Sequence, residues 1–304
     1  MTSPERAVFI SRDHCLGCHS TSLDVVASGR FDQGRVGEFL AADPWGEDPL
    51  PFLTGATWTL VRCRSCSLKF HREILSPEWG ERRFSKWMTS DAIKAFEAGE
   101  RNVNSFDRAA SFAEHVVRIE NLLRVSRPGK QRRKVLDFGC GDGEFIGLCA
   151  AFGFEAYGVD RSTARRENAG VKVYANLESA SKHAPFDAIT LFEVVEHLDD
   201  PGAILKTLHG LLDANGLLVL EAPNCKGVNN IETLADFRAI HPLEHINAFE
   251  PATLQAFAER IGFRREERRP VWVTGRPLVA LRRLVRSWLS PVVKADTRLY
   301  FRKA

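Results

Sequence analysis

From Lys134 onward, short apolar runs of strand length alternate with stretches that have helical spacing. The apolar runs are KVLDF (134–138), EAYGVD (155–160), VKVYA (171–175), DAITLF (187–192) and GLLVLEAP (216–223). Because each parallel strand needs a crossover connection, this alternation is typical of a doubly wound parallel sheet with helices on both faces. We therefore expect an α/β fold over this part of the chain.

The first of these strands leads into a glycine-rich loop, VLDFGCGDGEF (135–145), with glycines at 139, 141 and 143. A dinucleotide-binding loop has the spacing G-x-G-x-x-G and directs a helix N-terminus at a pyrophosphate. Here the spacing is G-x-G-x-G, and Asp137 precedes the first glycine by two residues. A carboxylate there repels phosphate and favours a cationic ligand. Asp160 ends the next strand, 21 residues after Gly139, where it can accept hydrogen bonds from ribose hydroxyls.

This region resembles the class I S-adenosylmethionine-dependent methyltransferases, and the match continues in order over residues 105–304. The resemblance implies a seven-stranded Rossmann-like sheet and a bound S-adenosylmethionine. It places Asp137 near the methionine amino group, Asp160 on the ribose and Phe192–Glu193 beside the cofactor. The residues implied to line the cofactor loop are Gly139, Gly141 and Gly143. The alternative is a Rossmann dehydrogenase, which would bind NAD instead.

Two C-x-x-C pairs lie near the N-terminus, Cys15–Cys18 and Cys63–Cys66. Together they can supply four thiolates in the tetrahedral arrangement of structural zinc. The second pair lies in TLVRCRSCSLKF, whose strand-knuckle-strand pattern is that of a zinc ribbon. A closed Cys₄ site has no open position for substrate, so we expect a structural Zn²⁺. The alternative is four reduced, unpaired thiols.

Three segments follow from these signals: a zinc-binding, zinc-ribbon-like segment (1–77), a helical connector (78–126) and the methyltransferase domain (127–304). In the connector, apolar residues recur at helical spacing: Phe112, Val116, Ile119, Leu122 and Leu123. A zinc segment ahead of such a domain is similar to a subgroup that includes sugar C-methyltransferases of natural-product pathways.

The segment HPLEH (241–245) has the letters of a zinc peptidase motif, H-x-x-E-H. Such a site needs both histidines on one helix face. Pro242 disfavours the helical conformation of the residue before it, so His241 should lie off any helix. The sequence therefore argues against a metallopeptidase.

The zinc-bearing sugar C-methyltransferases carry an aromatic-x-Glu-His element at this place, and Glu244 and His245 match its last two residues. Pro242 stands where the aromatic residue would be, which leaves C-, O- and N-methylation open. We expect His245 to take the acceptor's proton, Glu244 to orient it and His241 to lie near the acceptor. The alternative is that His245 only makes hydrogen bonds within its loop.

Charge and hydropathy limit the partners. The net charge is +3, and residues 264–304 contain ten arginines and two lysines against three acids. Within that tail, residues 277–289 form an amphipathic basic helix, which could pack on the sheet, contact a phosphate-bearing substrate or lie on an anionic membrane. No nucleic-acid-binding module is recognisable, so nucleic acid is disfavoured. The chain begins without an apolar leader, and we expect a cytoplasmic protein.

These observations predict methyl transfer from S-adenosylmethionine to a small molecule, foremost a sugar or nucleotide sugar. Two alternatives stay open. In the first, the zinc segment is a protein- or RNA-binding module on a methyltransferase scaffold. In the second, the enzyme methylates RNA.

Overall fold

The computed structural model describes residues 5–89, 91–93, 95, 105–126, 128–162, 171–229, 231–267 and 297–304, with five single positions between 271 and 285. The chain divides into two compact units. The first unit comprises the described residues of 1–101, 196–201 and 223–253, and the second comprises those of 102–195, 202–222 and 254–304.

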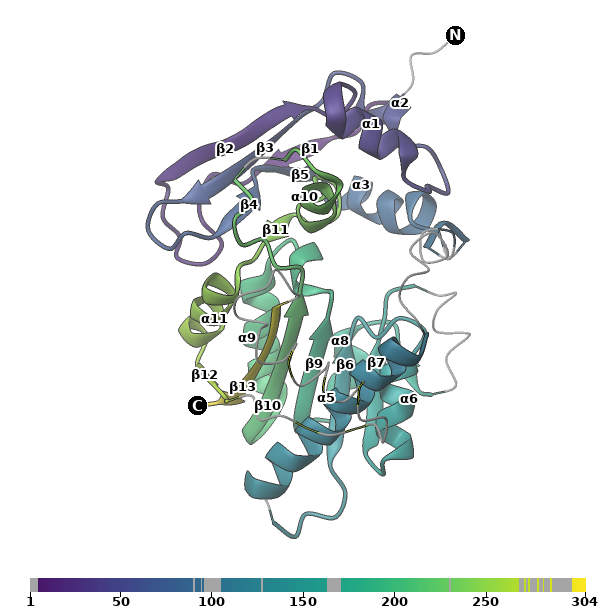
Figure 1. Ribbon diagram of the computed structural model, residues 1–304, viewed down its shortest axis with the longest axis vertical. Coiled ribbons are helices and arrows are strands. Elements are labelled where there is room, and N and C mark those ends of the chain that lie inside the picture. The colour runs from purple at the N-terminus through teal and green to yellow at the C-terminus, as the bar shows by residue number, and fades with distance from the viewer. Residues whose placement is uncertain are drawn as a thin grey trace. The chain divides into compact units, whose positions relative to one another are not determined.

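The second unit contains a seven-stranded sheet, which confirms the predicted α/β fold (Figure 1). Its strands are β6 (Lys134–Phe138), β7 (Glu155–Val159), β8 (Val173–Tyr174), β9 (Phe186–Phe192), β10 (Leu212–Ala222), β12 (Phe263–Arg265) and β13 (Thr297–Lys303). Their order is β12-β13-β10-β9-β6-β7-β8. Neighbours from β10 to β8 run parallel, whereas β13 is antiparallel to β10 and β12. The strand order reverses between β6 and β9, and ligands bind at such switch points in open α/β sheets.

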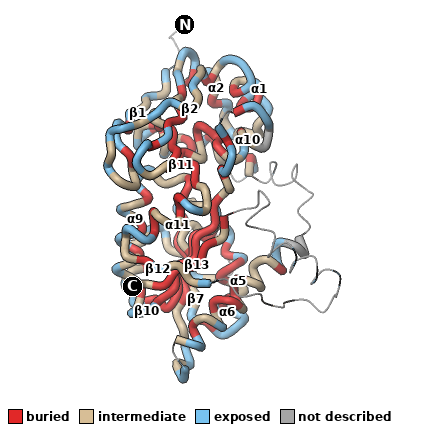
Figure 2. The backbone as a smooth tube through the Cα atoms, turned by 60° about the vertical axis from the view of Figure 1, so that its left-hand side comes forward, coloured by how far each residue is buried: buried red, intermediate tan, exposed pale blue. Residues whose placement is uncertain are grey.

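Helices α5 (Ser105–Ser126), α6 (Glu144–Ala151), α8 (Leu177–Ser181), α9 (Pro201–Leu211) and α11 (Pro251–Arg260) accompany the sheet. The predicted helical spacing in α5 is confirmed, because Val116, Ile119 and Leu123 are fully buried against strand residues such as Val135 and Val219. Burying each of these α5 side chains stabilises the fold by about 1.5–3 kcal/mol. Figure 2 shows the strands of this sheet mostly in the buried class.

The first unit contains two small antiparallel sheets. One has the order β11-β4-β3-β2, from β2 (Leu23–Arg30), β3 (Thr57–Cys63), β4 (Lys69–His71) and β11 (Asn247–Ala248), and the other pairs β1 (Phe9–Ser11) with β5 (Glu73–Leu75). Its helices are α1 (Gly34–Ala42), α2 (Leu50–Leu53), α3 (Pro77–Arg82), the π-helix η1 (Arg83–Trp87) and α10 (Leu234–Ala239). Its core combines aliphatic side chains with several aromatic ones, among them Phe31, Trp58, Trp79, Trp87 and Phe237.

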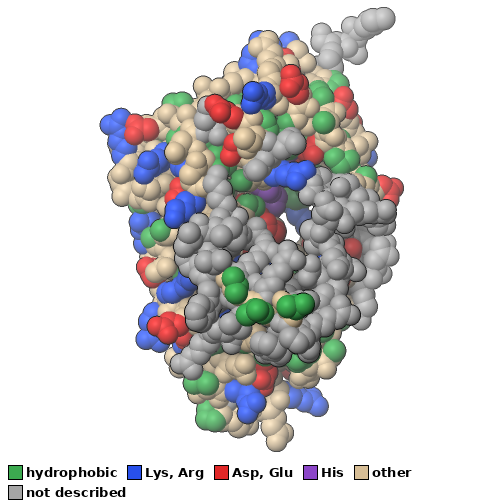
Figure 3. Space-filling view, viewed as in Figure 1, with side chains coloured by type: hydrophobic (Ala, Val, Ile, Leu, Met, Phe, Trp, Pro, Cys, Tyr) green, Lys and Arg blue, Asp and Glu red, His purple; other side chains and the backbone are tan. Residues whose placement is uncertain are grey.

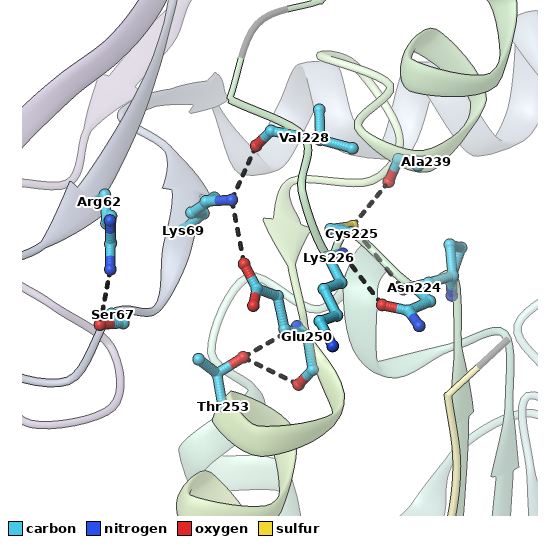
Figure 4. A network of polar contacts seen from close by, with 11 residues as sticks. Arg62, Ser67, Lys69, Asn224, Cys225, Lys226, Val228, Ala239, Glu250 and Thr253 are labelled. Carbon is cyan, nitrogen blue, oxygen red and sulfur yellow. Dashed lines mark hydrogen bonds and ion pairs between the residues drawn. The ribbon is translucent and has the colours of Figure 1, made fainter. Parts of the chain in front are cut away.

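Residues 223–253 belong to the first unit, although the sequence predicted one contiguous methyltransferase segment over 127–304. The reason is a strand pairing and two buried cations. Strand β11 pairs with β4, and the Arg12 guanidinium donates to the carbonyls of His71 and Ile246. The Lys69 ammonium donates to the Val228 carbonyl and to a Glu250 carboxylate oxygen at 3.0 Å (Figure 4).

The predicted connector (78–126) is divided in the same way. The described helices α3 and η1 lie in the first unit, and α5 lies in the second. Helix α3 is held by its own unit, since Trp79 is buried in the aromatic core and Arg82 forms an ion pair with Glu47.

Most of the predicted basic helix (277–289) lies outside the described residues. Three described positions in it are helical, and their apolar side chains are exposed: Leu278, Leu281 and Val285. Over the described part of the chain, no helix has the length and apolarity that a membrane span requires. Basic and acidic side chains are interspersed on the described surface in Figure 3.

Candidate active site

The glycine loop follows β6 at the carboxyl edge of the second unit's sheet. All three glycines have positive φ, at 79° for Gly139, 55° for Gly141 and 79° for Gly143, a conformation that glycine adopts without strain. A methyl group on Gly139 would overlap the Val194 side chain. The loop therefore needs glycine both for its backbone conformation and for its close packing.

Asp137 is a buried carboxylic acid of β6, close to the start of this loop. It is 3% exposed, and the Thr190 hydroxyl on β9 donates a 2.6 Å hydrogen bond to it. Burial raises the pKa of Asp137 to about 7, and the charge of Asp160 adds to the rise, whereas the Thr190 hydrogen bond opposes it. A cation is the ligand that would restore its ionised form.

Asp160 lies directly after β7 and connects the loop to the next strand. One of its carboxylate oxygens accepts from the Gly141 amide at 2.9 Å, and the other accepts from the Ser162 amide at 2.8 Å. The two acids predicted from sequence therefore converge on one loop. This arrangement can hold a ligand that has a cationic end and a ribose.

Phe192 and Glu193 end β9, next to β6 in the sheet. The Phe192 ring lies 4.6 Å from the His115 ring on α5 and 4.8 Å from the Phe145 ring on α6, measured between centroids. Glu193 has a positive φ of 53°, and its amide donates to the Glu221 carbonyl. The chain thus turns sharply at the end of β9, after an aromatic cluster that fixes the Phe192 ring.

The four predicted cysteines lie together in the first unit, with their sulfur atoms within 4.8 Å of one another. The Sγ atoms of Cys15 and Cys66 are 3.4 Å apart, and those of Cys18 and Cys63 are 3.5 Å apart. Thiolates bound to one zinc at about 2.3 Å would stand about 3.8 Å apart, so the cluster fits a tetrahedral zinc ion with small adjustments.

The two cysteine pairs also share one backbone geometry. In each pair, the amide four residues after the first cysteine donates to that cysteine's carbonyl, from His19 to Cys15 and from Ser67 to Cys63. Both donor residues have positive φ, 60° and 63°. Burial by itself raises the pKa of Cys63, but amide donors from Cys66 and Ser65 and a hydrogen bond with Cys18 hold it near 7. Burial raises the pKa of Cys15 and of Cys18, so Cys63 forms the thiolate that zinc binds more readily than either of them.

His245 lies in the first unit beside His197, which the sequence analysis did not single out. Their ring centroids are 4.8 Å apart, and the His197 Nδ1 atom lies 2.8 Å from the Glu244 carbonyl oxygen. Burial lowers the pKa of both imidazoles, to about 3 for His245, so both are neutral at physiological pH. Asn247 ties the two segments together, since its amide donates to the Leu198 carbonyl at 2.7 Å.

His241 and Glu244 form a second group with Asp43, in which the three side chains place ligand atoms within 4.8 Å of one another. The His241 Nε2 atom lies 3.2 Å from an Asp43 carboxylate oxygen, and its Nδ1 accepts from the Leu243 amide. Residues 241–245 form a turn rather than a helix, as Pro242 predicts. Among the described residues, His241 and His245 fall into two different groups of potential metal ligands, so they do not form the histidine pair of the peptidase motif.

A family model for a methyltransferase domain matches residues 109–267. The chain belongs to this family. The fold agrees, because the plantazolicin methyltransferase BpumL, solved with S-adenosylhomocysteine and a substrate analogue, superposes with a TM-score of 0.52. That comparison has 13% sequence identity and covers 74% of this chain and 94% of BpumL, so it supports the fold alone.

Curated relatives of this methyltransferase are named ubiquinone biosynthesis O-methyltransferase. The Caulobacter sp. (strain K31) protein is 31% identical over 125 residues, which cover 36% of this chain and 50% of that protein. The Psychrobacter arcticus protein is 29% identical over 167 residues, which cover 47% of this chain and 64% of that protein. The chain therefore spans between half and two thirds of the length of these relatives.

Three residues of this methyltransferase site carry little or no signal in the sequence. Thr190 has a weak signal, as a polar residue two positions before the end of a buried strand. Glu196 and His197 follow Phe192 and Glu193 after two valines, in FEVVEH, and this place shortly after the end of β9 was the available clue.

The raised pKa of Asp137 predicts that cofactor affinity depends on pH. If the carboxylate must be ionised to hold an ammonium group, binding is strong above pH 7 and weakens as the pH falls through that value. Affinity for S-adenosylhomocysteine should be about tenfold lower at pH 6 than at pH 8, because the ionised fraction changes by that factor. Calorimetric titration at both pH values measures this, and Asp137→Asn should bind weakly with no pH trend. Equal wild-type affinity at pH 6 and 8 would contradict the assignment.

Proposed function

We propose that this protein transfers the methyl group of S-adenosylmethionine to a hydroxyl group of a small molecule. The observation that carries the proposal is the convergence of Asp137, Asp160 and the glycine loop at the switch point of a methyltransferase sheet. Asp137 would hold the methionine ammonium, and Asp160 the ribose hydroxyls. The other loop and strand-end residues would line the cofactor: Gly139, Gly141, Gly143, Phe192 and Glu193.

S-adenosylmethionine supplies an electrophilic methyl carbon on a sulfonium. The acceptor oxygen forms its bond to that carbon as the carbon–sulfur bond breaks, and the electron pair leaves on sulfur. The acceptor must also lose its proton. We assign promotion of that proton loss to His245, whose Nδ1 atom is buried and makes no hydrogen bond in the described structure. His241 and Glu244 would support the same loop.

An acceptor hydroxyl is favoured by the names of the relatives, which are O-methyltransferases. The resemblance to sugar methyltransferases makes sugars and nucleotide sugars the first acceptors to test. We also propose that Cys15, Cys18, Cys63 and Cys66 hold a structural zinc ion, which would fix the loop before β2 against the β3–β4 turn.

The test is S-adenosylhomocysteine release from S-adenosylmethionine in the presence of sugars, nucleotide sugars and phenols. We expect stoichiometric S-adenosylmethionine binding and acceptor-dependent turnover with a hydroxyl compound. NAD binding without S-adenosylmethionine binding would overturn the proposal. Turnover only with RNA would replace the small acceptor by a nucleic acid.

A further inference from the structure

Glu196, His197 and His245 form a compact group within the first unit. Their ligand atoms, one carboxylate oxygen and two imidazole nitrogens, lie within 4.8 Å of one another. The Glu196 side chain is 1% exposed, and its Oε1 lies 3.7 Å from the His197 Nε2 atom. Ligand atoms at 2.0–2.2 Å from one ion stand at most about 4.4 Å apart. Small movements of the three side chains would therefore bring their ligand atoms within binding distance of a single ion.

The hydrogen bonds of the two histidines fix which nitrogen carries the proton. His197 Nδ1 lies 2.8 Å from the Glu244 carbonyl, so it must be the donor, and the Nε2 lone pair faces Glu196. His245 is hydrogen-bonded to the backbone of Arg238 and Ala239, while its buried Nδ1 makes no hydrogen bond. The Nε2 lone pair of His197, the Nδ1 lone pair of His245 and the Glu196 carboxylate are therefore the three candidate metal ligands. Metal-binding histidines show this same pattern, in which the second ring nitrogen donates to a carbonyl.

The surrounding charge also suits a cation. Arg83 and His241 both act electrostatically on the two imidazoles. The carboxylate of Glu196 lies within the group, and those of Asp43 and Glu244 lie beside it around His241, whose ring centroid is 6.4 Å from that of His245. The Arg12 guanidinium lies on the other side, where it donates to the carbonyl of Ile246, one residue after His245.

We propose that Glu196, His197 and His245 bind a divalent first-row transition-metal ion that coordinates the acceptor hydroxyl. Two imidazoles and one carboxylate favour such an ion over calcium, and three protein ligands leave positions open for a substrate oxygen. This inference rests on the proposed function. Held by these three residues, the ion would lower the pKa of a coordinated hydroxyl group, whose proton would pass to solvent, and His245 would promote proton loss by holding the ion.

Manganese binding by the full-length protein, prepared with a single zinc ion per chain for the cysteine cluster, tests the site. Mn²⁺ prefers nitrogen and oxygen ligands, so the cysteine cluster should not compete. Titration followed by the electron paramagnetic resonance of free Mn²⁺ should show one bound ion per chain. Glu196→Gln and His245→Asn should each weaken binding at least about tenfold, and His209→Ala, which changes a histidine of α9, should leave it unchanged.

Binding of S-adenosylhomocysteine provides the control for folding and separates the two proposals. A wild-type protein that binds S-adenosylhomocysteine and no Mn²⁺ overturns the metal site and leaves methyl transfer standing. Equal Mn²⁺ binding by wild type and both variants also overturns it. Mn²⁺ binding lost in the variants, without any S-adenosylhomocysteine binding by the wild type, supports the metal site and contradicts methyl transfer.

Discussion

Replacing Cys63 with serine is expected to remove zinc from the purified protein and to unfold its first unit. A structural zinc contributes about 10–16 kcal/mol to the folding of small zinc-binding peptides, which matches or exceeds the usual net stability of a domain, about 5–15 kcal/mol. Cys63 ends β3 and is fully buried, so its loss removes one ligand and leaves three thiols clustered without their ion.

Tryptophan fluorescence and metal analysis measure this outcome. Trp58, Trp79 and Trp87 are buried in the core of the first unit, so its unfolding should shift their emission to longer wavelengths. Wild type should contain one more zinc ion per chain than Cys63→Ser. Ser65→Ala is the matched control, because it changes an exposed side chain of the same turn and keeps all four thiols. A Cys63→Ser protein with native emission and unchanged thermal stability would refute the structural role.

The second large effect is expected from His245→Ala, which should reduce turnover by about 10²–10⁴-fold. Affinity for S-adenosylmethionine should stay within about twofold of wild type, since His245 is not among the residues proposed to hold the cofactor. Steady-state S-adenosylhomocysteine release and calorimetric titration give the two quantities.

His209→Ala is again the matched control. Its position near the end of α9, just before β10 begins, places it at the amino edge of the sheet, away from the ligand-binding edge. It should retain near-wild-type turnover. If His245→Ala kept full turnover with normal cofactor binding, proton removal would have to be assigned elsewhere.

Local patterns determined much of this protein. Apolar runs of strand length, interrupted by helical spacing, predict the parallel strands β6 to β10, because each strand carries its own signal. The glycine spacing and the acids at 137 and 160 predict the loop that the structure shows, since positive φ at glycine is a local requirement. The two C-x-x-C pairs predict the cysteine cluster for the same reason, as each pair forms its own turn.

Tertiary structure alone decided how the remaining segments come together. Strand β11 has two residues and pairs with β4 across more than 170 positions of sequence. A strand this short has no recognisable periodicity. The predicted contiguous segments therefore did not include this pairing. Asn247 of the same strand ties the segment of His245 to that of His197, which is 48 residues earlier, and the contact between His241 and Asp43 spans 198 residues. Such contacts depend on burial and hydrogen bonding between distant segments. A single sequence shows which residues are present, but it does not show which distant residues contact one another.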